Sequence, residues 1–421
     1  MYDLIVVGGG LTGVAAAAAA KREGVEKVLL IEQSGFLGGA PGMNYVNPFM
    51  PYQLVVGENK IKDRDWLSKG MFKEVLTRLR EKNGVPYDHW SPVFNEEILK
   101  IIMDELTDEY GVEVLFHAKL VDVACVDGKV NSVTVAGKSG KLTLEAKYFV
   151  DATGDADLSA FAGFPFHLGR EDGLCQPMTL CFRIGNIDTE AFSGEERQRA
   201  QALYKEYQAA GKITNPRENI LIFKHALPGV LHFNTTRVVK HNPTDMWDVS
   251  KAEKIARKQM YEMYNFLKDN IRGFENSVLL SSAPAIGVRE SRMIDGEYTL
   301  TVEDLTSFTK FEDGIAACNY DIDIHSPDGS GTSHWYFPDG TYYTIPYRCL
   351  IPKNSKNLLT AGRCISSTHE AQASYRIMPV CCTLGEAAGV AIGLAVKNSA
   401  NVKDVDTTTL RAKLKEYDAF F

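Results

Sequence analysis

Residues 2–24, YDLIVVGGGLTGVAAAAAAKREG, contain the pattern that decides the fold. Residues 2–7 form a short apolar run with β-branched side chains, which predicts a buried parallel strand. Gly8, Gly10 and Gly13 follow with the spacing G-x-G-x-x-G, and the small residues after them suit a closely packed helix. A strand, a glycine turn and a helix in this order bind the pyrophosphate of a dinucleotide at the helix N-terminus. The sequence therefore predicts a Rossmann-like domain of the α/β class.

A carboxylate and a second glycine loop refine this prediction. Residues 28–31 form another apolar strand that ends at Glu32, about 20 residues past the last glycine, where a carboxylate accepts hydrogen bonds from ribose hydroxyls. A carboxylate there also repels a 2′-phosphate, which disfavours NADP. Gly38 and Gly39 in the next loop are placed where backbone could approach a cofactor. An ordinary flexible loop is the alternative for these two glycines.

Length and composition limit the class of protein. The 421 residues suggest two to three domains, and the formal net charge of −8 gives no reason to expect a nucleic acid or an anionic membrane as partner. No uninterrupted apolar run reaches the length of about 18 residues needed to span a membrane, and the first strand leaves no room for a signal peptide. We therefore expect a cytoplasmic protein. The eight cysteines show no C-x-x-C spacing, so we expect no metal site and no iron–sulfur cluster.

The region between the second strand and residue 157 mixes helices with a β-meander. An apolar stripe predicts a helix over 66–82, and Asn95 is the expected N-cap of a helix over about 95–110. Residues 112–157 then alternate along strands broken at Asp127-Gly128 and Ser139-Gly140, both hairpin signals, before DATGD. A plain dehydrogenase would not need this inserted meander.

The segment NLLTAGRCISSTHEAQASYRIMPVCCTLGEAAGVAIGLAV, residues 357–396, points to a flavin. It predicts a strand that ends at Gly362, an irregular loop, and a helix that begins near Pro379. Gly385 and Gly389 recur at i, i+4 among alanines, so one face of that helix suits close packing. An NAD-dependent enzyme completes its cofactor site early in the chain. A flavin needs a second set of contacts, and a helix N-terminus at its pyrimidine end stabilises the charge of the reduced form.

Several blocks together resemble a known family. VVGGGLTG, GFLGG, DATGDAD, QPMTLCFRIGN, VRESRMIDGEYTLT, LLTAGRCISSTHEA, RIMP and GEAAG are similar, in this order, to the FAD-dependent oxidoreductase family of the glutathione-reductase-2 type. This bacterial family is related to fumarate reductases, aspartate oxidases and the flavin subunits of heterodisulfide reductases. In many relatives the loop after the double glycine is richer in Met, Ala and Thr, and APGMNYVNPF differs. The expected FAD contacts are Gly8, Gly10, Leu11, Thr12, Gly13, Glu32, Gly38, Gly39, Ala152, Thr153, Gly154, Asp155, Gly362, Arg363 and Pro379.

The same evidence predicts a two-domain organisation. We expect a discontinuous FAD-binding domain over 1–165 and 341–421, with a helical insertion near 60–90, and an α+β substrate domain, or cap, over 166–340. Two capping boxes, Ser250 with Glu253 and Thr301 with Asp304, mark helices in the cap. HWYFPDGTYYTIPY predicts a hairpin at Asp339-Gly340 that returns the chain to the FAD-binding domain.

A few polar residues are candidates for the chemistry. Arg289 and Arg292 in GVRESR offer guanidinium forks that match a substrate carboxylate, although arginines are more often structural ion-pair partners. His325 and His369 could transfer protons, and Arg376 lies in the same C-terminal loop as His369. We expect a small anionic substrate between the flavin and the cap, held by Arg289 or Arg292 and served by His369.

The sequence leaves three functions open. It contains no second G-x-G-x-x-G and no C-x₄-C pair, so an external electron donor or acceptor must reach the flavin directly. The first alternative is hydride transfer between a small organic substrate and flavin N5. The others are an electron-transfer subunit of a heterodisulfide-reductase-like complex, and a flavoprotein whose FAD is structural or serves RNA modification. The acidic charge weighs against RNA, and a homo-oligomer stays open.

Overall fold

The centre of the protein is a parallel sheet that follows the Rossmann order. A computed structural model of the chain describes residues 1–60, 62–88 and 91–421. The strand order is β5-β2-β1-β8, and β19 also pairs with β8, all in parallel. These strands are β1 (Tyr2–Val7), β2 (Val28–Ile31), β5 (Glu113–Leu115), β8 (Gly140–Asp151) and β19 (Leu358–Thr360). The predicted α/β class and the Rossmann-like core are confirmed.

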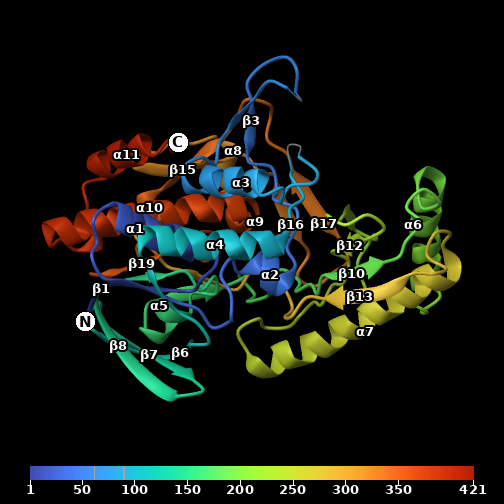
Figure 1. Cartoon of the computed structure of the whole chain (residues 1–421), viewed down its shortest axis with the longest axis horizontal. Coiled ribbons are helices and arrows are strands. Elements are labelled where there is room, and N and C mark those ends of the chain that lie inside the picture. Colours follow the sequence, from blue (N-terminus) through green and yellow to red (C-terminus); the bar gives the residue numbers. More distant parts are fainter. Residues whose placement is uncertain (61, 89–90) are drawn as a thin grey trace.

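The predicted meander is present and shares a strand with this core. β6 (Lys119–Val126) and β7 (Lys129–Gly137) pair antiparallel, and β7 continues onto the first half of β8. The second half of β8 pairs with β1 and β19, so one strand belongs to both parts (Figure 1). Asp127 and Gly128 form the first turn, both with positive φ. The second turn lies one residue earlier than predicted, because Gly140 is already paired with Gly137.

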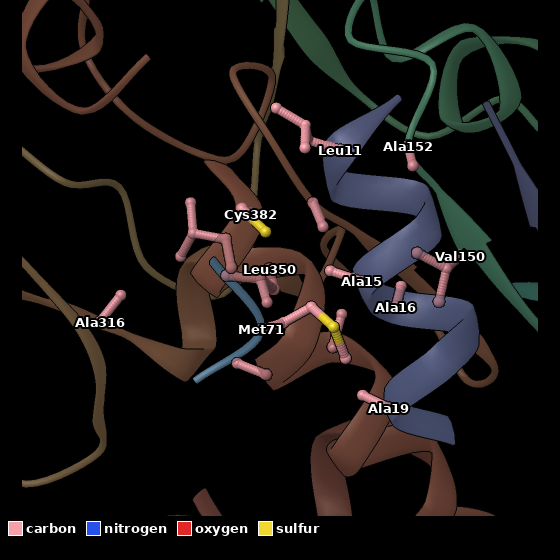
Figure 2. Close-up of a cluster of buried hydrophobic side chains, with 14 of the residues drawn as sticks. Leu11, Ala15, Ala16, Ala19, Met71, Val150, Ala152, Ala316, Leu350 and Cys382 are labelled. Atoms are coloured by element: carbon pink, nitrogen blue, oxygen red, sulfur yellow. The ribbon is translucent and has the colours of Figure 1, made fainter. Parts of the chain in front are cut away.

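Two helices pack closely on one side of the sheet. They are α1 (Leu11–Arg22) and α10 (Met378–Asn398), and Figure 2 shows the alanines of α1 in the resulting core. A Cβ on Gly385 would overlap with the carbonyl oxygen of Thr12, and one on Gly389 with that of Ala16. The glycines therefore allow the two backbones to approach, as the sequence predicted.

The helix α10 also corrects one expectation from the sequence. It is the one helix in the described part of the chain that is long and apolar enough, by composition, to cross a membrane. The sequence analysis missed this because it looked for an unbroken apolar run, whereas Thr383 and Glu386 interrupt this one. Within the fold, 94% of its most apolar window is buried, so it has the burial of a core helix.

Further helices cover the core, and their ends follow local signals. The side-chain oxygen of Asn95 accepts the N–H groups of Glu97 and Ile98, which confirms the predicted cap of α4. The helix predicted over 66–82 begins only at Met71, because residue 66 is paired in a short hairpin. The elements of this region are α2 (Ala40–Asn44), β3 (Gln53–Val55), β4 (Arg64–Trp66), α3 (Met71–Glu81), α4 (Glu96–Tyr110), α5 (Asp157–Phe161), α9 (His369–Tyr375) and α11 (Thr407–Glu416).

The cap contains an antiparallel sheet with its own core, which confirms the α+β expectation. Its strand order is β11-β12-β10-β13, and α6 and α7 pack on one face around Phe182 and Phe233, whose rings stack at 4.9 Å. The elements are β10 (Phe182–Gly185), α6 (Gly194–Ala209), β11 (Ile222–Lys224), β12 (Leu231–Phe233), α7 (Met246–Asn270) and β13 (Val278–Ser282). Figure 1 shows this group at one end of the molecule.

Two of the local signals in the cap behave differently. The capping box of Thr301 and Asp304 is present and begins α8 (Val302–Thr306). The one predicted for Ser250 is wrong, since Asp245 caps α7 and the Ser250 hydroxyl donates to the Met246 carbonyl inside the helix.

The predicted hairpin at Asp339-Gly340 is also wrong. The strand before this turn pairs with β16 and the strand after it pairs with β15, so the two strands do not pair with each other. The second of them is completely buried while the first is largely exposed, so burial separates them. The strands are β9 (Phe166–Leu168), paired with β14 (Arg292–Ile294), β15 (Gly314–Cys318), β16 (Ile322–His325), β17 (Thr332–Trp335) and β18 (Tyr343–Pro346).

Candidate active site

The glycine turn leaves the N-terminus of α1 open to an anion. Gly10 is the N-cap residue, no side chain caps the helix, and its first turn has no acidic residue. The free N–H groups and the helix dipole therefore favour a negative group there. A Cβ on Gly10 would meet only the Cα of Gly39, at 3.9 Å, so there is room for a ligand to approach. A Cβ on Gly13 would overlap with the Gly8 carbonyl oxygen, so Gly13 serves packing.

The expected ribose contact and the second glycine loop adjoin this turn. Glu32 is 8% exposed, and its two carboxylate oxygens accept the N–H groups of Gly9 and Ser34, each at 2.7 Å. Each oxygen keeps acceptor capacity for a hydroxyl group. Gly38 bridges to Gly10, and both Gly38 and Gly39 have positive φ, at 106° and 67°.

The third and fourth segments meet the same helix end. Gly362 lies beside Thr12, since a Cβ on the glycine would be 3.3 Å from the threonine Oγ1. Arg363 pairs with Asp155 at 2.6 Å and lies against Gly154. The fully buried Asp151, which the sequence analysis did not single out, accepts hydrogen bonds from Thr153 and Ser159 and holds this turn. Ala152 contacts Gly13, and Pro379 begins the helix whose Gly385 touches Thr12.

His369 forms a buried pair with a glutamate. It is the first residue of α9, and its Nδ1 lies 2.7 Å from Oε1 of Glu290, with side chains 6% and 0% exposed. The other oxygen of Glu290 accepts the backbone N–H of Gln176. An ionised Glu290 keeps the proton of a neutral imidazole on Nδ1, so Nε2 is the basic atom. Nε2 has no hydrogen-bond partner among the described residues.

The two arginines around Glu290 point to different places. Arg289 donates to the Pro177 carbonyl at 2.7 Å and to the Thr179 hydroxyl, whereas Arg292 pairs with Asp157 at 2.7 Å beside the turn at 151–155. Side chains three residues apart in extended chain project to opposite sides. The structure therefore does not bring Arg289 and Arg292 to one substrate group.

Instead, Arg289 joins two other arginines. Burial lowers the pKa of Arg289, and the charges of Arg217 and Arg376 lower it further. Arg217 is 4% exposed, and its Nη1 has no partner in the described part of the chain; the same holds for Nε of Arg376. Arg376 reaches the carboxylate of Asp323 at 3.4 Å, the one ion pair recorded for these three arginines. Positive charge therefore exceeds negative charge here, and we call Arg217, Arg289 and Arg376 the arginine cluster.

His325 is held in one tautomer next to this cluster. Its Nδ1 lies 2.9 Å from a guanidinium nitrogen of Arg237, and because arginine only donates, Nδ1 must accept. The proton is then on Nε2, which faces Asp323 at 3.3 Å. Burial, together with the charge of Arg289, holds the pKa of His325 well below its ordinary value. Burial raises the pKa of Asp323, but the hydrogen bond and charge of His325 outweigh it and leave the pKa low.

The sequence analysis missed several of these residues. Arg217 and Arg237 come from a loop and a strand end that carry no motif, and only the folded chain brings them together. Glu290 had a signal, because it lies inside the VRESR segment that had already been singled out.

The fold and the site together define a dinucleotide-binding flavoprotein. An open helix N-terminus, a carboxylate after the second strand and contacts from the C-terminal segment fit FAD. The chain matches the model of a family described as FAD dependent oxidoreductase over residues 3–414, and it belongs to this family. The protein is thus an FAD-dependent oxidoreductase, an enzyme class that uses a small-molecule substrate and a redox partner.

Solved structures share the fold at low sequence identity. A geranylgeranyl bacteriochlorophyll reductase-like protein from Thermoplasma acidophilum has a TM-score of 0.51 at 12% identity, with 99% of this chain and 83% of that chain covered. The p-nitrophenol 4-monooxygenase of Pseudomonas putida gives a TM-score of 0.48 at 12% identity, covering 100% and 87%. The myxobacterial chondrochloren halogenase gives 0.45 at 15% identity, covering 99% and 79%. No match was found among curated proteins.

Proposed function

We propose that the enzyme transfers a hydride between a small organic anion and N5 of FAD. The observation that supports this most directly is the arginine cluster, whose buried N–H donors on Arg217 and Arg376 lack partners among the described residues. Buried charge is stable only when it is paired. A substrate carboxylate supplies both the missing charge and the missing acceptors, and arginine matches its geometry.

His369 is the acid or base in this proposal. FAD supplies the acceptor or donor of the hydride. Removing a hydride from a C–H bond requires a proton to leave a neighbouring O–H, N–H or C–H group. Nε2 of His369 takes that proton while Glu290 stabilises the resulting imidazolium through Nδ1. The cluster holds the carboxylate in place, and such positioning supplies several kcal/mol of barrier reduction. Arg292, which pairs with Asp157, supports the turn at the cofactor instead.

The experiment is anaerobic photoreduction of the purified FAD-loaded enzyme, followed by a screen of oxidants and organic acids that monitors the flavin absorption band. Each acid is compared with its methyl ester, which lacks the negative charge. We expect electron exchange with an acid and at least tenfold weaker action on its ester. Esters that react as well as the acids would contradict the proposal.

Variants identify the residues. Arg376→Gln should raise KM for the reactive acid by about tenfold or more, and His369→Ala should slow flavin reduction by about 10². The control is Arg170→Gln, since Arg170 is a solvent-exposed cap arginine paired with Asp172. If Arg376→Gln behaves like this control, the carboxylate does not bind at the cluster.

We also propose the finer classification as the glutathione-reductase-2 type and the domain limits 1–165 with 341–421 and 166–340. The separate hydrophobic core around Phe182 and Phe233 supports the cap as a unit. Limited proteolysis tests the limits: a flavin-bound fragment containing only residues 1–165 would contradict them. An external electron donor or acceptor and a cytoplasmic location belong to the same proposal, which the heterodisulfide-type alternative would replace if an iron–sulfur partner co-purified.

A further inference from the structure

The inner face of the cap sheet carries polar residues opposite to its apolar core. In β10, Arg183 lies between the core residues Phe182 and Ile184, so its side chain projects to the other face. His232 of β12 is its direct cross-strand neighbour. Arg183 pairs with Glu96 of α4 at 2.6 Å and lies 3.9 Å from the ring centre of Tyr45. This face therefore turns toward the FAD-binding part.

Three residues on this face have buried polar atoms without partners among the described residues. His232 is 2% exposed, and neither of its ring nitrogens has a partner. The same is true of Nε2 of His225, which is 8% exposed, and of Nε of Arg183, which is 7% exposed. A buried polar group without a partner is rare in a folded protein and destabilises it. The three come within range of each other, since Arg183 and His225 both act on the pKa of His232.

The chemistry of these atoms defines what they can bind. Nδ1 of His225 accepts the N–H of Leu227 at 3.1 Å, so Nε2 carries the proton and donates. Arg183 donates as well, and a neutral His232 has one donor and one acceptor. Donors therefore outnumber acceptors. The ion pair with Glu96 neutralises Arg183, so the group suits an uncharged oxygen and not a second carboxylate.

This group adjoins the arginine cluster. Cys181 lies two residues before Arg183 on the same face, about 7 Å away along a strand. Burial raises the pKa of the Cys181 thiol to about 11, and the charges of Arg289, Arg217 and Arg183 all act on it in the opposite direction. Cys181 is therefore within range of both groups.

We propose that Arg183, His225 and His232 form a second substrate subsite, which hydrogen-bonds a keto or hydroxyl oxygen of a molecule whose carboxylate is held by the arginine cluster. The substrate class is then a keto acid or the corresponding hydroxy acid. This inference rests on the proposed function, because it takes the position of the carboxylate from it.

The test is calorimetric binding of straight-chain acids to the FAD-loaded enzyme. The probes are 4-oxopentanoate, 5-oxohexanoate and 6-oxoheptanoate, each compared with the alkanoate of the same length. We expect at least one keto acid to bind tenfold more tightly than its alkanoate. Equal binding of all three pairs would overturn the subsite and leave the carboxylate site intact. No binding of any acid would overturn both.

A variant separates binding from folding. His232→Leu should abolish the preference for the keto acid while alkanoate binding stays within about twofold, and it should not lower the melting temperature, because it removes unpaired polar atoms from the interior. His232→Gln, which keeps a donor and an acceptor, should retain part of the preference. The control is His241→Leu, in the same part of the chain but bonded to the Val239 carbonyl. A lower melting temperature together with an unchanged preference in His232→Leu would assign the histidine a structural role and overturn the proposal.

Discussion

Replacing Gly10 by alanine should separate cofactor binding from folding. Gly10 has φ −69° and ψ 178°, which alanine adopts without strain, and an added Cβ would meet nothing closer than 3.9 Å. The apoprotein should therefore keep its stability or gain about 0.4–1 kcal/mol, because alanine restricts the unfolded chain. The same methyl group fills the space beside the open N-terminus of α1, where the diphosphate of FAD approaches.

The loss of FAD affinity can be worked from this geometry. The methyl group displaces a phosphate oxygen by roughly 1 Å or more, since carbon and oxygen do not approach below van der Waals contact. One charge-assisted hydrogen bond contributes about 1.5–3 kcal/mol, so losing one weakens FAD binding about tenfold or more. Urea unfolding of the apoprotein and fluorescence titration with FAD measure the two quantities.

The matched control is Gly13→Ala in the same turn. Its Cβ would overlap with the Gly8 carbonyl oxygen, so it should destabilise the apoprotein by about 1–3 kcal/mol. Two results refute the reasoning about Gly10: unchanged FAD affinity in Gly10→Ala, or an apoprotein as destabilised as Gly13→Ala.

Three further variants test packing, capping and buried charge. Gly385→Ala should lower the free energy of unfolding by about 2 kcal/mol in urea, although alanine favours helix, because its Cβ overlaps with the Thr12 backbone; an unchanged midpoint would contradict the close packing of α1 and α10. Asn95→Ala should cost about 1 kcal/mol in the same assay through loss of the cap on α4, and Asn95→Asp should not. Burial, with the charges of Arg183 and His225, lowers the pKa of His232 to about 3. The unfolded chain then binds the extra proton, so stability is lost as pH falls below about 6.5, and wild type should lose about 2 kcal/mol more than His232→Gln between pH 6.5 and 4.5; parallel pH profiles would contradict a neutral His232.

The sequence predicted best what short segments decide. Gly8 and Gly13 act through neighbours in their own turn, and Asn95 caps the helix that directly follows it, so local pattern was enough. The meander followed from alternation and two turn signals. The hairpin at Asp339-Gly340 failed because its flanking strands found partners elsewhere, which a local pattern does not encode.

The candidate site was predictable only in part. His369 was chosen for its place in the C-terminal loop, and the structure gives it a buried glutamate partner. Arg217 and His232 could not be found, because what distinguishes them is a lack of partners in the interior. That property arises when distant segments meet, and no spacing along the chain records it.

The packing of α1 against α10 has a consequence for synthesis of the protein. More than three hundred residues separate the two helices, so α1 leaves the ribosome long before the helix that covers its alanine face. Until α10 arrives, a nascent chain exposes that face and lacks the C-terminal contacts of the cofactor. Such late, long-range contacts slow folding and leave intermediates open to aggregation. Premature termination before Met378 should therefore yield a chain that depends on chaperones and neither holds FAD nor resists proteolysis.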